Sequence, residues 1–113
     1  MPKYNIVNLG FSTADGERPE LQFIGGDIQF SFIDMGGHPV RFGASDVRAF
    51  SWVEELDIQG LRDDIAYEVE GSEIIEKYRR WNLLSPEDDY HHFKLCFNAA
   101  GVFDVVCKTI TVD

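Results

Sequence analysis

The sequence predicts an α+β fold that is mainly β, with an antiparallel sheet packed against one amphipathic helix. Short runs of alternating apolar and polar residues recur between turn signals, as is typical of antiparallel strands. We expect about six to seven strands, in a sheet that is curled or forms a half-barrel. One stretch, over about residues 72–84, instead carries apolar residues at helical spacing. The chain of 113 residues is 44% hydrophobic, so one core and a single compact domain over residues 1–113 are expected.

Turn residues divide the N-terminal part of the chain into strands. Residues 4–11 are rich in apolar side chains and predict the first strand, whereas the polar residues 12–20 predict a surface loop. Residues 21–24 predict the next strand, which the pair Gly25-Gly26 ends. Residues 27–34 alternate most regularly, so one face of this strand should carry Ile28, Phe30 and Phe32.

The middle of the chain predicts a hairpin followed by less regular structure. The pair Gly36-Gly37 supplies the positive φ angles of a tight turn, and Pro39 opens the returning strand. Residues 46–56 follow neither the strand nor the helix period strictly. We interpret them as a strand with a bulge, with a short helix as the alternative. A polar loop over residues 57–64 then precedes a short strand over 65–69.

The helix has a recognisable start, a buried stripe and an end. Ser72 is suited to the N-cap, and Glu73 lies in the first turn, where the helix dipole favours an anion. Ser85-Pro86 either ends the helix or opens one more turn, because proline disfavours helical backbone in the residue before it. The residues expected in the buried stripe are Ile74, Tyr78 and Trp81.

The C-terminal segment predicts a hairpin with one apolar face. Pairing Asn98 with Val102 sets Phe97 opposite Phe103, and the same register sets Leu95 opposite Val105 and Phe93 opposite Cys107. The three-residue loop 99–101 then needs a left-handed last residue, which Gly101 supplies. Because the apolar positions change phase afterwards, we expect a bulge near Lys108 or Thr109.

The charge of the chain excludes some partners. Twenty acidic and ten basic residues give a net charge of -10, which repels nucleic-acid phosphates and anionic lipid and favours a basic protein. No apolar run is long enough to span a bilayer, and no signal peptide is visible at the N-terminus. The two cysteines do not form a paired-spacing motif, which favours a reducing cytoplasm.

Motifs for metal or cofactor chemistry are weak. His91 and His92 lie beside Asp89 and Cys96, but adjacent residues of a strand point to opposite faces, so we expect no metal and no cofactor. These histidines should lie partly solvated where the strand starts. Cys96 and Cys107 should face opposite sides of the hairpin, so no disulfide joins them. A nucleophilic pair of Cys96 and His92 lacks an orienting group.

The favoured function is a non-enzymatic protein-interaction module with no catalytic residue. Carboxylates between Glu54 and Glu76, here called the acidic rim, would steer a basic partner, and the apolar residues among them would form a desolvated contact. An immunity-type inhibitor of a basic toxin is one form of this function. The expected partner-binding residues are Glu54, Glu55, Leu56, Asp57, Ile58, Asp63 and Asp64.

Two other functions stay open. The curled sheet could enclose an apolar pocket for a small molecule, as a carrier or an enzyme, lined by phenylalanines such as Phe23 and Phe30. Tyr90, His92 and Cys96 would then lie at the mouth of that pocket. Alternatively, the chain could be a structural subunit of a homo-oligomer, with a dimer as one form, which would show as a paired edge strand.

Overall fold

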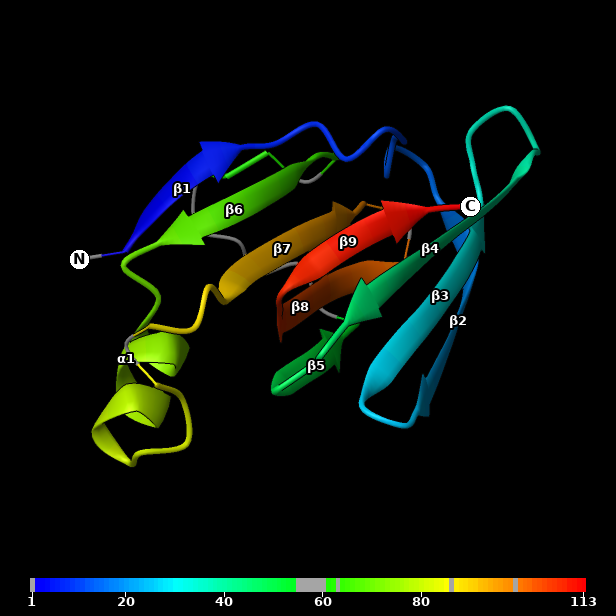
Figure 1. The fold of residues 1–113 in the computed structure, drawn as a ribbon. Helices are drawn as coiled ribbons and strands as arrows, with labels where there is room; N and C mark the ends of the chain where they lie inside the picture. Colours follow the sequence, from blue (N-terminus) through cyan, green and yellow to red (C-terminus); the bar gives the residue numbers. More distant parts are fainter. Residues whose placement is uncertain (1, 55–60, 63, 86, 99) are drawn as a thin grey trace.

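The computed structural model describes residues 2–54, 61–62, 64–85, 87–98 and 100–113. In this part of the chain, nine strands form two antiparallel sheets, and one helix lies at one end of the molecule (Figure 1). The mainly β, α+β class is therefore confirmed. The expected single curled sheet is wrong, because the strands divide between two sheets that share a core.

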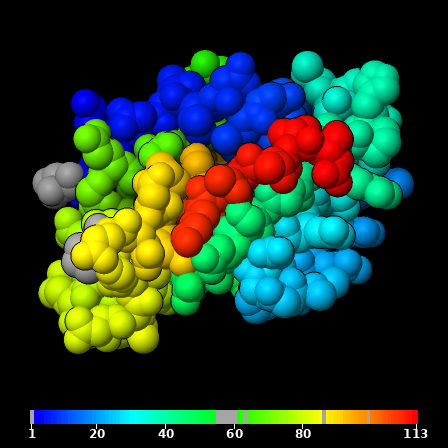
Figure 2. Space-filling view, in the orientation of Figure 1, coloured from blue at the N-terminus to red at the C-terminus, as the bar shows by residue number. Residues whose placement is uncertain are grey.

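The two sheets draw on both halves of the chain. The five-stranded sheet has the order β1 (Lys3–Ile6), β6 (Ala66–Glu70), β7 (His91–Phe97), β8 (Gly101–Cys107), β5 (Ala49–Val53). The four-stranded sheet has the order β2 (Glu17–Ile24), β3 (Asp27–Ile33), β4 (Pro39–Ser45), β9 (Thr109–Val112). The helix α1 (Glu73–Arg80) follows β6. In Figure 2 it projects at the opposite end of the molecule from the β2–β3 hairpin.

Aromatic side chains fill the space between the sheets. The alternating residues of β3 point inward as expected, and Phe30 lies at the centre of the core. Its ring is 4.9 Å from that of Phe42 in its own sheet and 5.4 and 5.0 Å from those of Phe97 and Phe103 in the other sheet. Burial of these rings is the main force that holds the sheets together.

The segment before β2 belongs to the core more than the sequence suggested. The first strand ends at Ile6 rather than at residue 11, and the following Val7, Leu9 and Phe11 leave the sheet and pack against the core. Residues 12–20 are not simply a surface loop, because Thr13 and Gly16 are buried and β2 already begins at Glu17.

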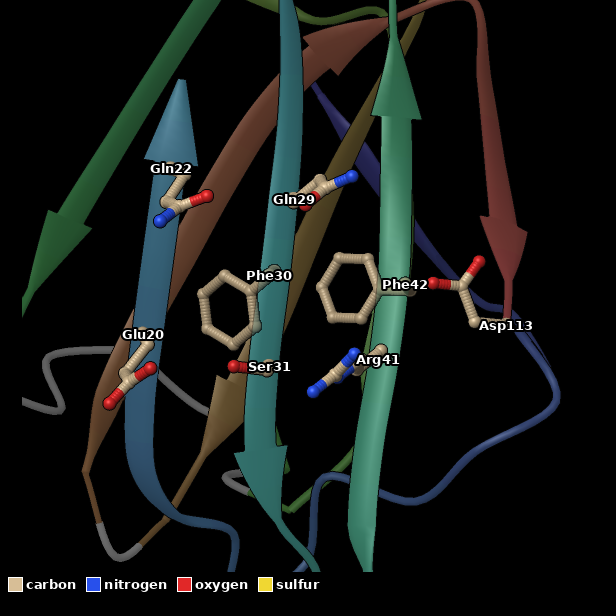
Figure 3. Close-up of a pocket in the computed structure, with 8 residues that line it drawn as sticks. All are labelled: Glu20, Gln22, Gln29, Phe30, Ser31, Arg41, Phe42 and Asp113. Carbon is tan, nitrogen blue, oxygen red and sulfur yellow. The ribbon is translucent and has the colours of Figure 1, made fainter. Parts of the chain in front are cut away.

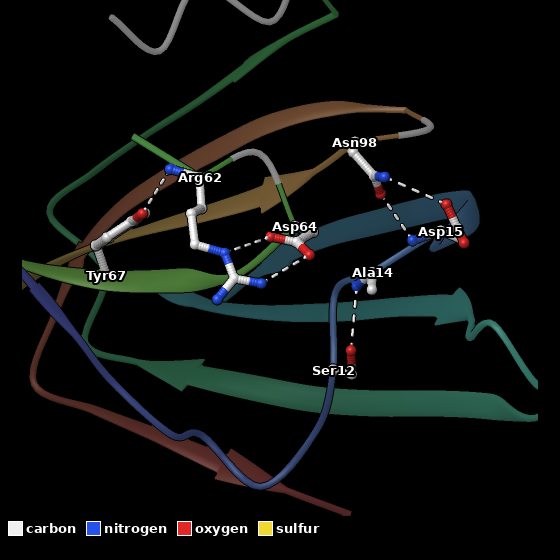
Figure 4. A network of polar contacts seen from close by, with 7 residues as sticks. All are labelled: Ser12, Ala14, Asp15, Arg62, Asp64, Tyr67 and Asn98. Carbon is white, nitrogen blue, oxygen red and sulfur yellow. Dashed lines mark hydrogen bonds and ion pairs between the residues drawn. The ribbon is translucent and has the colours of Figure 1, made fainter. Parts of the chain in front are cut away.

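Side-chain hydrogen bonds hold that segment in place (Figure 4). The Asn98 amide oxygen accepts the backbone N–H of Asp15 at 2.7 Å, and the Asn98 amide nitrogen donates to the Asp15 carboxylate at 3.2 Å. These bonds join the chain before β2 to the end of β7. Beside them, the Tyr67 hydroxyl accepts the backbone N–H of Arg62 at 2.7 Å.

The C-terminal hairpin keeps its apolar face but has a different register. Phe97 pairs with Gly101 and Leu95 with Phe103, which is two residues from the predicted alignment. A shift of two residues leaves the same side chains on the buried face, so alternation could not distinguish the two registers. Gly101 is the first residue of β8 rather than a loop residue. A Cβ atom there would lie 2.5 Å from the Val53 carbonyl oxygen, which explains the glycine.

Two strands pass from one sheet to the other at the same place. Ser45 pairs with Thr109 in the four-stranded sheet, and Ala49 pairs with Val106 in the five-stranded sheet. The strands β4 and β5 thus form one side of a bent two-stranded ribbon, and β8 and β9 form the other. At the bend, residues 46–48 face only residues 107–108. Both predicted bulges, the one within residues 46–56 and the one near Lys108 or Thr109, fall at this bend, but the extra residue is on the β4–β5 side. The alternative of a short helix is wrong, because Ala49–Val53 form a strand.

A cluster of charged groups stabilises the bend. Asp46, which has a positive φ of 52°, accepts a hydrogen bond from the Tyr90 hydroxyl at 2.9 Å. The Arg48 guanidinium and the Lys108 ammonium lie 3.2 and 3.5 Å from its carboxylate. The Tyr90 hydrogen bond, together with these two cations, holds the pKa of Asp46 below its usual value despite some desolvation. The bend is therefore anchored to the residue before β7.

The helix starts as predicted but ends earlier. Ser72 is the N-cap, and its hydroxyl accepts the backbone N–H of Ile75. The helix stops at Arg80 rather than at residue 84, because Asn82 adopts a left-handed backbone conformation. Trp81 therefore lies on the terminal turn, is 58% exposed and is not part of the buried stripe, while Ile75 is buried instead. Among the described residues, no helix has the length and apolar character needed to cross a bilayer.

Truncation of Phe30 tests the role of the aromatic core. We expect Phe30→Ala to lower the free energy of unfolding by about 3–5 kcal/mol, because it leaves a cavity between the sheets. Urea denaturation followed by circular dichroism measures this loss. Phe23→Ala, which truncates a phenylalanine that is half exposed, is the control and should cost clearly less. Equal losses for the two variants would contradict the central position of Phe30.

Candidate functional site

The structure describes only part of the predicted partner-binding segment. Glu54 is exposed directly after β5. Asp64 lies in an ion pair with Arg62, at 3.0 Å, which partly neutralises its charge. The other five predicted residues lie outside the described part of the chain: Glu55, Leu56, Asp57, Ile58 and Asp63.

Large apolar side chains gather on one open side of the molecule. The strands β2 and β5 are the terminal strands of their sheets, and their Phe23 and Phe50 rings lie 5.3 Å apart. These two phenylalanines are 52% and 42% exposed, and Ile24 and Val53 on the same strands are 66% and 49% exposed. We call Phe23 and Phe50 the open-side patch. Ile24 and Val53 alternate with them along β2 and β5 and therefore point to the outer faces of the two sheets.

The strand register explains why the two phenylalanines face inward and yet remain exposed. Phe23 pairs with Ile28, and Phe50 pairs with Val105, both of which are fully buried. Paired residues share a face, so both phenylalanines point toward the space between the sheets. Among the described residues, however, neither sheet has a further strand beyond β2 or β5 to cover them. The expectation that Phe23 lines an internal pocket is wrong, because it lies on a terminal strand. Alternation along the sequence does not show which strands are terminal.

His92 lies in a buried hydrogen-bond network instead of being partly solvated. Its Nδ1 atom is 2.7 Å from the Ser72 hydroxyl, and its Nε2 atom is 2.7 Å from an Asp104 carboxylate oxygen. The other Asp104 oxygen accepts a hydrogen bond from Lys94 at 3.0 Å. The network connects the N-cap of α1 to β7 and β8, so it fixes the helix on the outer face of the five-stranded sheet.

The chemistry of this network is structural. Serine, histidine and aspartate in this order also occur in hydrolytic relays. Here, however, Ser72 is buried and its hydroxyl also accepts the Ile75 N–H, so it caps the helix rather than facing a substrate. Burial alone would raise the pKa of Asp104, but the His92 hydrogen bond and the Lys94 charge outweigh it and hold the pKa below its usual value. Asp104 therefore stays ionised and holds both partners.

The three residues expected at a pocket mouth have different surroundings. Tyr90 and His92 both line a hollow of about 210 Å³ between α1 and the strands β6 and β7, but carboxylates such as Glu68 and Glu76 also line it. Cys96 is fully buried and is not among its lining residues. The hollow is thus polar, whereas the predicted pocket was apolar. The phenylalanines expected to line such a pocket, Phe30 among them, pack against one another in the core.

A second hollow lies on the outer face of the four-stranded sheet (Figure 3). It measures about 340 Å³ and forms because the short Ser31 on β3 lies between longer side chains on β2 and β4. Amide and charged groups converge there, so it suits polar groups rather than apolar ones. The polar lining residues are Glu20, Gln22, Gln29, Ser31, Arg41 and Asp113.

His91 points to the opposite side of β7 from His92 and contacts two carboxylates. Its ring nitrogens lie 3.0 Å from Glu68 and 3.3 Å from Asp89. Partial burial disfavours the charged ring, but the hydrogen bond and charge of Glu68, with a further contribution from Asp89, outweigh burial and raise the pKa of His91. The His91 ring therefore joins β6 to the residues before β7.

Neither cysteine is placed for chemistry at the surface. Cys96 and Cys107 are both buried and form no disulfide, as expected. Burial raises the pKa of the Cys107 thiol to about 12, so this thiol is not nucleophilic at neutral pH. In the described ranges, no three His, Cys, Asp or Glu residues are grouped as a metal site would require.

Comparison of the chain with protein-family models, with curated proteins and with solved structures found no match. The function therefore has to be argued from the surface of the molecule. The open-side patch is a feature that packing within the described part of the chain does not explain, because Phe23 and Phe50 contact each other and yet remain in contact with water.

Loss of the Asp104 charge should destabilise the protein at neutral pH. We expect Asp104→Asn to lower the free energy of unfolding by about 1–3 kcal/mol, because His92 and Lys94 lose a shared ionised partner. Folding lowers the pKa of Asp104. The ionised carboxylate therefore contributes to the free energy of unfolding above its unfolded pKa of about 3.9, and this contribution is lost as the pH falls through the folded pKa. Denaturation from pH 7 to acid should therefore show a shallower decline for Asp104→Asn. A parallel decline would contradict this assignment.

The His91 contacts predict the opposite pH dependence. Its raised pKa means that its contribution to stability is complete below the unfolded pKa of about 6.5 and is lost as the pH rises through the folded pKa. We expect Glu68→Gln to move the pKa of His91 back toward 6.5, as measured by NMR titration of the ring protons. Glu70→Gln, on the same face two residues along β6, is the control and should leave the titration unchanged.

Proposed function

We propose that this chain is a non-enzymatic protein-interaction module that binds a basic protein through the open-side patch and the carboxylates near it. The observation that carries this proposal is the exposure of Phe23 and Phe50, which lie in contact with each other on two terminal strands. A contiguous apolar patch on a small protein commonly marks a surface that another molecule covers. Aromatic side chains are enriched at the centres of such surfaces.

The charge around the patch supports a basic partner. Glu54 directly follows β5, and Asp27 directly follows the turn after β2, so exposed carboxylates lie at the ends of both strands that carry the patch. The acidic rim continues from Glu54, and the whole chain has a net charge of -10. Such a field accelerates the approach of a basic protein and opposes the approach of another acidic one. The apolar patch would then supply the desolvated contact.

The packing of the core supports this function more than the binding of an apolar ligand. The Phe30, Phe97 and Phe103 rings occupy the space that an apolar ligand would need. The hollows on the four-stranded sheet and beside α1 are both lined by charged groups. Two buried thiols suit a reducing compartment, and we propose the cytoplasm as the place where the module acts.

A capture experiment with variant baits tests the proposal. The wild-type chain is immobilised, exposed to a lysate of its host and washed with salt from about 50 to 500 mM, a range over which charge screening becomes strong. We expect a basic protein to be retained at low salt and released at high salt. Two variants should no longer retain this protein. The double variant Phe23→Ser, Phe50→Ser removes the aromatic contact. The triple variant Glu54→Lys, Glu55→Lys, Asp57→Lys reverses the charge.

The control variant changes charge elsewhere. Glu87→Lys with Asp89→Lys alters exposed residues in the segment between α1 and β7 and should retain the partner. Circular dichroism and urea denaturation establish that every bait is folded. If the double phenylalanine variant and the charge-reversed triple variant both retained the same protein, this surface would not be the binding site, and the proposal would be wrong.

A further inference from the structure

Of the terminal strands of the two sheets, β5 is the least protected against pairing with another strand. Natural proteins protect terminal strands with charged residues, prolines, bulges or short length, because their free N–H and C=O groups can bind a further strand. The strand β2 contains Pro19 and shifts its register between Glu17 and Glu20. The strands β1 and β9 have only four residues each, and Lys3 opens β1.

By contrast, β5 has the properties of a strand that accepts a partner. Its five residues, Ala49–Val53, include no charged residue, proline or glycine. They pair with β8 without interruption, from Ala49 opposite Val106 to Val53 opposite Val102, so the strand is regular over its whole length. Phenylalanine, tryptophan and valine also have high strand propensity.

The side chains on β5 define what a neighbouring strand would contact. Phe50 and Trp52 face the space between the sheets, and Trp52 is held there against Phe30 at 6.0 Å. Phe23 on β2 forms the opposite wall at this side of the molecule. A strand added beside β5 would therefore point every second side chain toward the side of the sheet on which Phe23 and Phe50 lie. Apolar side chains suit these inward positions.

We propose that the partner binds by adding an extended segment to the five-stranded sheet as a new strand beside β5. This inference rests on the proposed function and specifies its mode. Backbone hydrogen bonds to β5 provide the affinity, as in other cases of strand addition. The inserted segment alternates apolar residues, which contact Phe23 and Phe50, with basic residues, which face solvent and are attracted by Glu54 and by the net charge of -10.

The net charge argues that the added strand comes from a basic protein rather than from a second copy of this chain. Two copies would each bring a net charge of -10 to the interface, and like charges oppose association. A basic segment meets the opposite field. Pairing of β5 with β5 of another copy is therefore the alternative that the experiment must distinguish.

A pair of synthetic peptides tests this mode directly. The probe is a blocked peptide of about seven residues, the length of an ordinary strand, with alternating lysine and valine. Its control has the same sequence and charge but carries N-methyl groups on the valine nitrogens, which cannot donate hydrogen bonds. We expect the control to bind about tenfold more weakly in an isothermal titration, because it loses several backbone hydrogen bonds.

Hydrogen exchange followed by NMR locates the added strand. With the first peptide, exchange of amides in Ala49–Val53 should slow about tenfold or more, while amides of β1 and β9 should keep their rates. Phe50→Lys should abolish this protection, since an inward-pointing lysine repels a basic strand and blocks the apolar contact. Tyr4→Lys, on the terminal strand β1, is the control, because it makes the same change of charge at a residue that is 40% exposed, compared with 42% for Phe50. This variant should bind the first peptide normally.

The outcomes separate this inference from the proposed function. Equal binding of the two peptides, or unchanged exchange in β5, would overturn strand addition. The proposed function would stand if Phe50→Lys still weakened peptide binding relative to Tyr4→Lys. Slowed exchange in β5 that depends on protein concentration without any peptide would show a second copy as the occupant and would also overturn the proposal.

Discussion

The contact of Phe30 with aromatic rings from both sheets is the interaction on which the rest of the structure depends. Phe30 meets Phe42 in its own sheet and Phe97, Phe103 and Trp52 in the other. With the two sheets held together there, β2 and β5 become neighbours at one side of the molecule, and Phe23 and Phe50 come into contact. The outer face of the five-stranded sheet is then left for α1. The aromatic core thus determines which surfaces are covered and which remain exposed.

Local features of the fold could be predicted from the sequence, whereas the arrangement of strands could not. The alternation around Phe30 identified β3 and its inward face, and Ser72 identified the start of the helix, because both depend on short-range periodicity or capping. The register of Leu95 was predicted two residues away, since such a shift preserves the buried face. The division into two sheets depends on where the chain bends at Asp46 and Lys108, and periodicity alone does not specify such bends.

The candidate site was predicted still less well, because exposure is a property of the assembled sheets. Phe23 and Phe50 have the same apolar character as Phe30, and only their position on terminal strands leaves them accessible. The acidic character of the surface could be deduced directly from composition. The burial of His92 could not, since its partner Asp104 comes from another strand and Ser72 from the helix N-cap.

The bent ribbon of β4–β5 and β8–β9 also has a consequence for how the chain folds. Each side of the ribbon contributes one strand to each sheet, so the two sheets are joined through both sides of the bend. Phe42 pairs with Val112, 70 residues later in the sequence, so β4 gains its second neighbour only through a contact of long sequence separation. Contacts between residues so distant in sequence slow folding. These strands should therefore fold together in one cooperative step rather than one strand at a time.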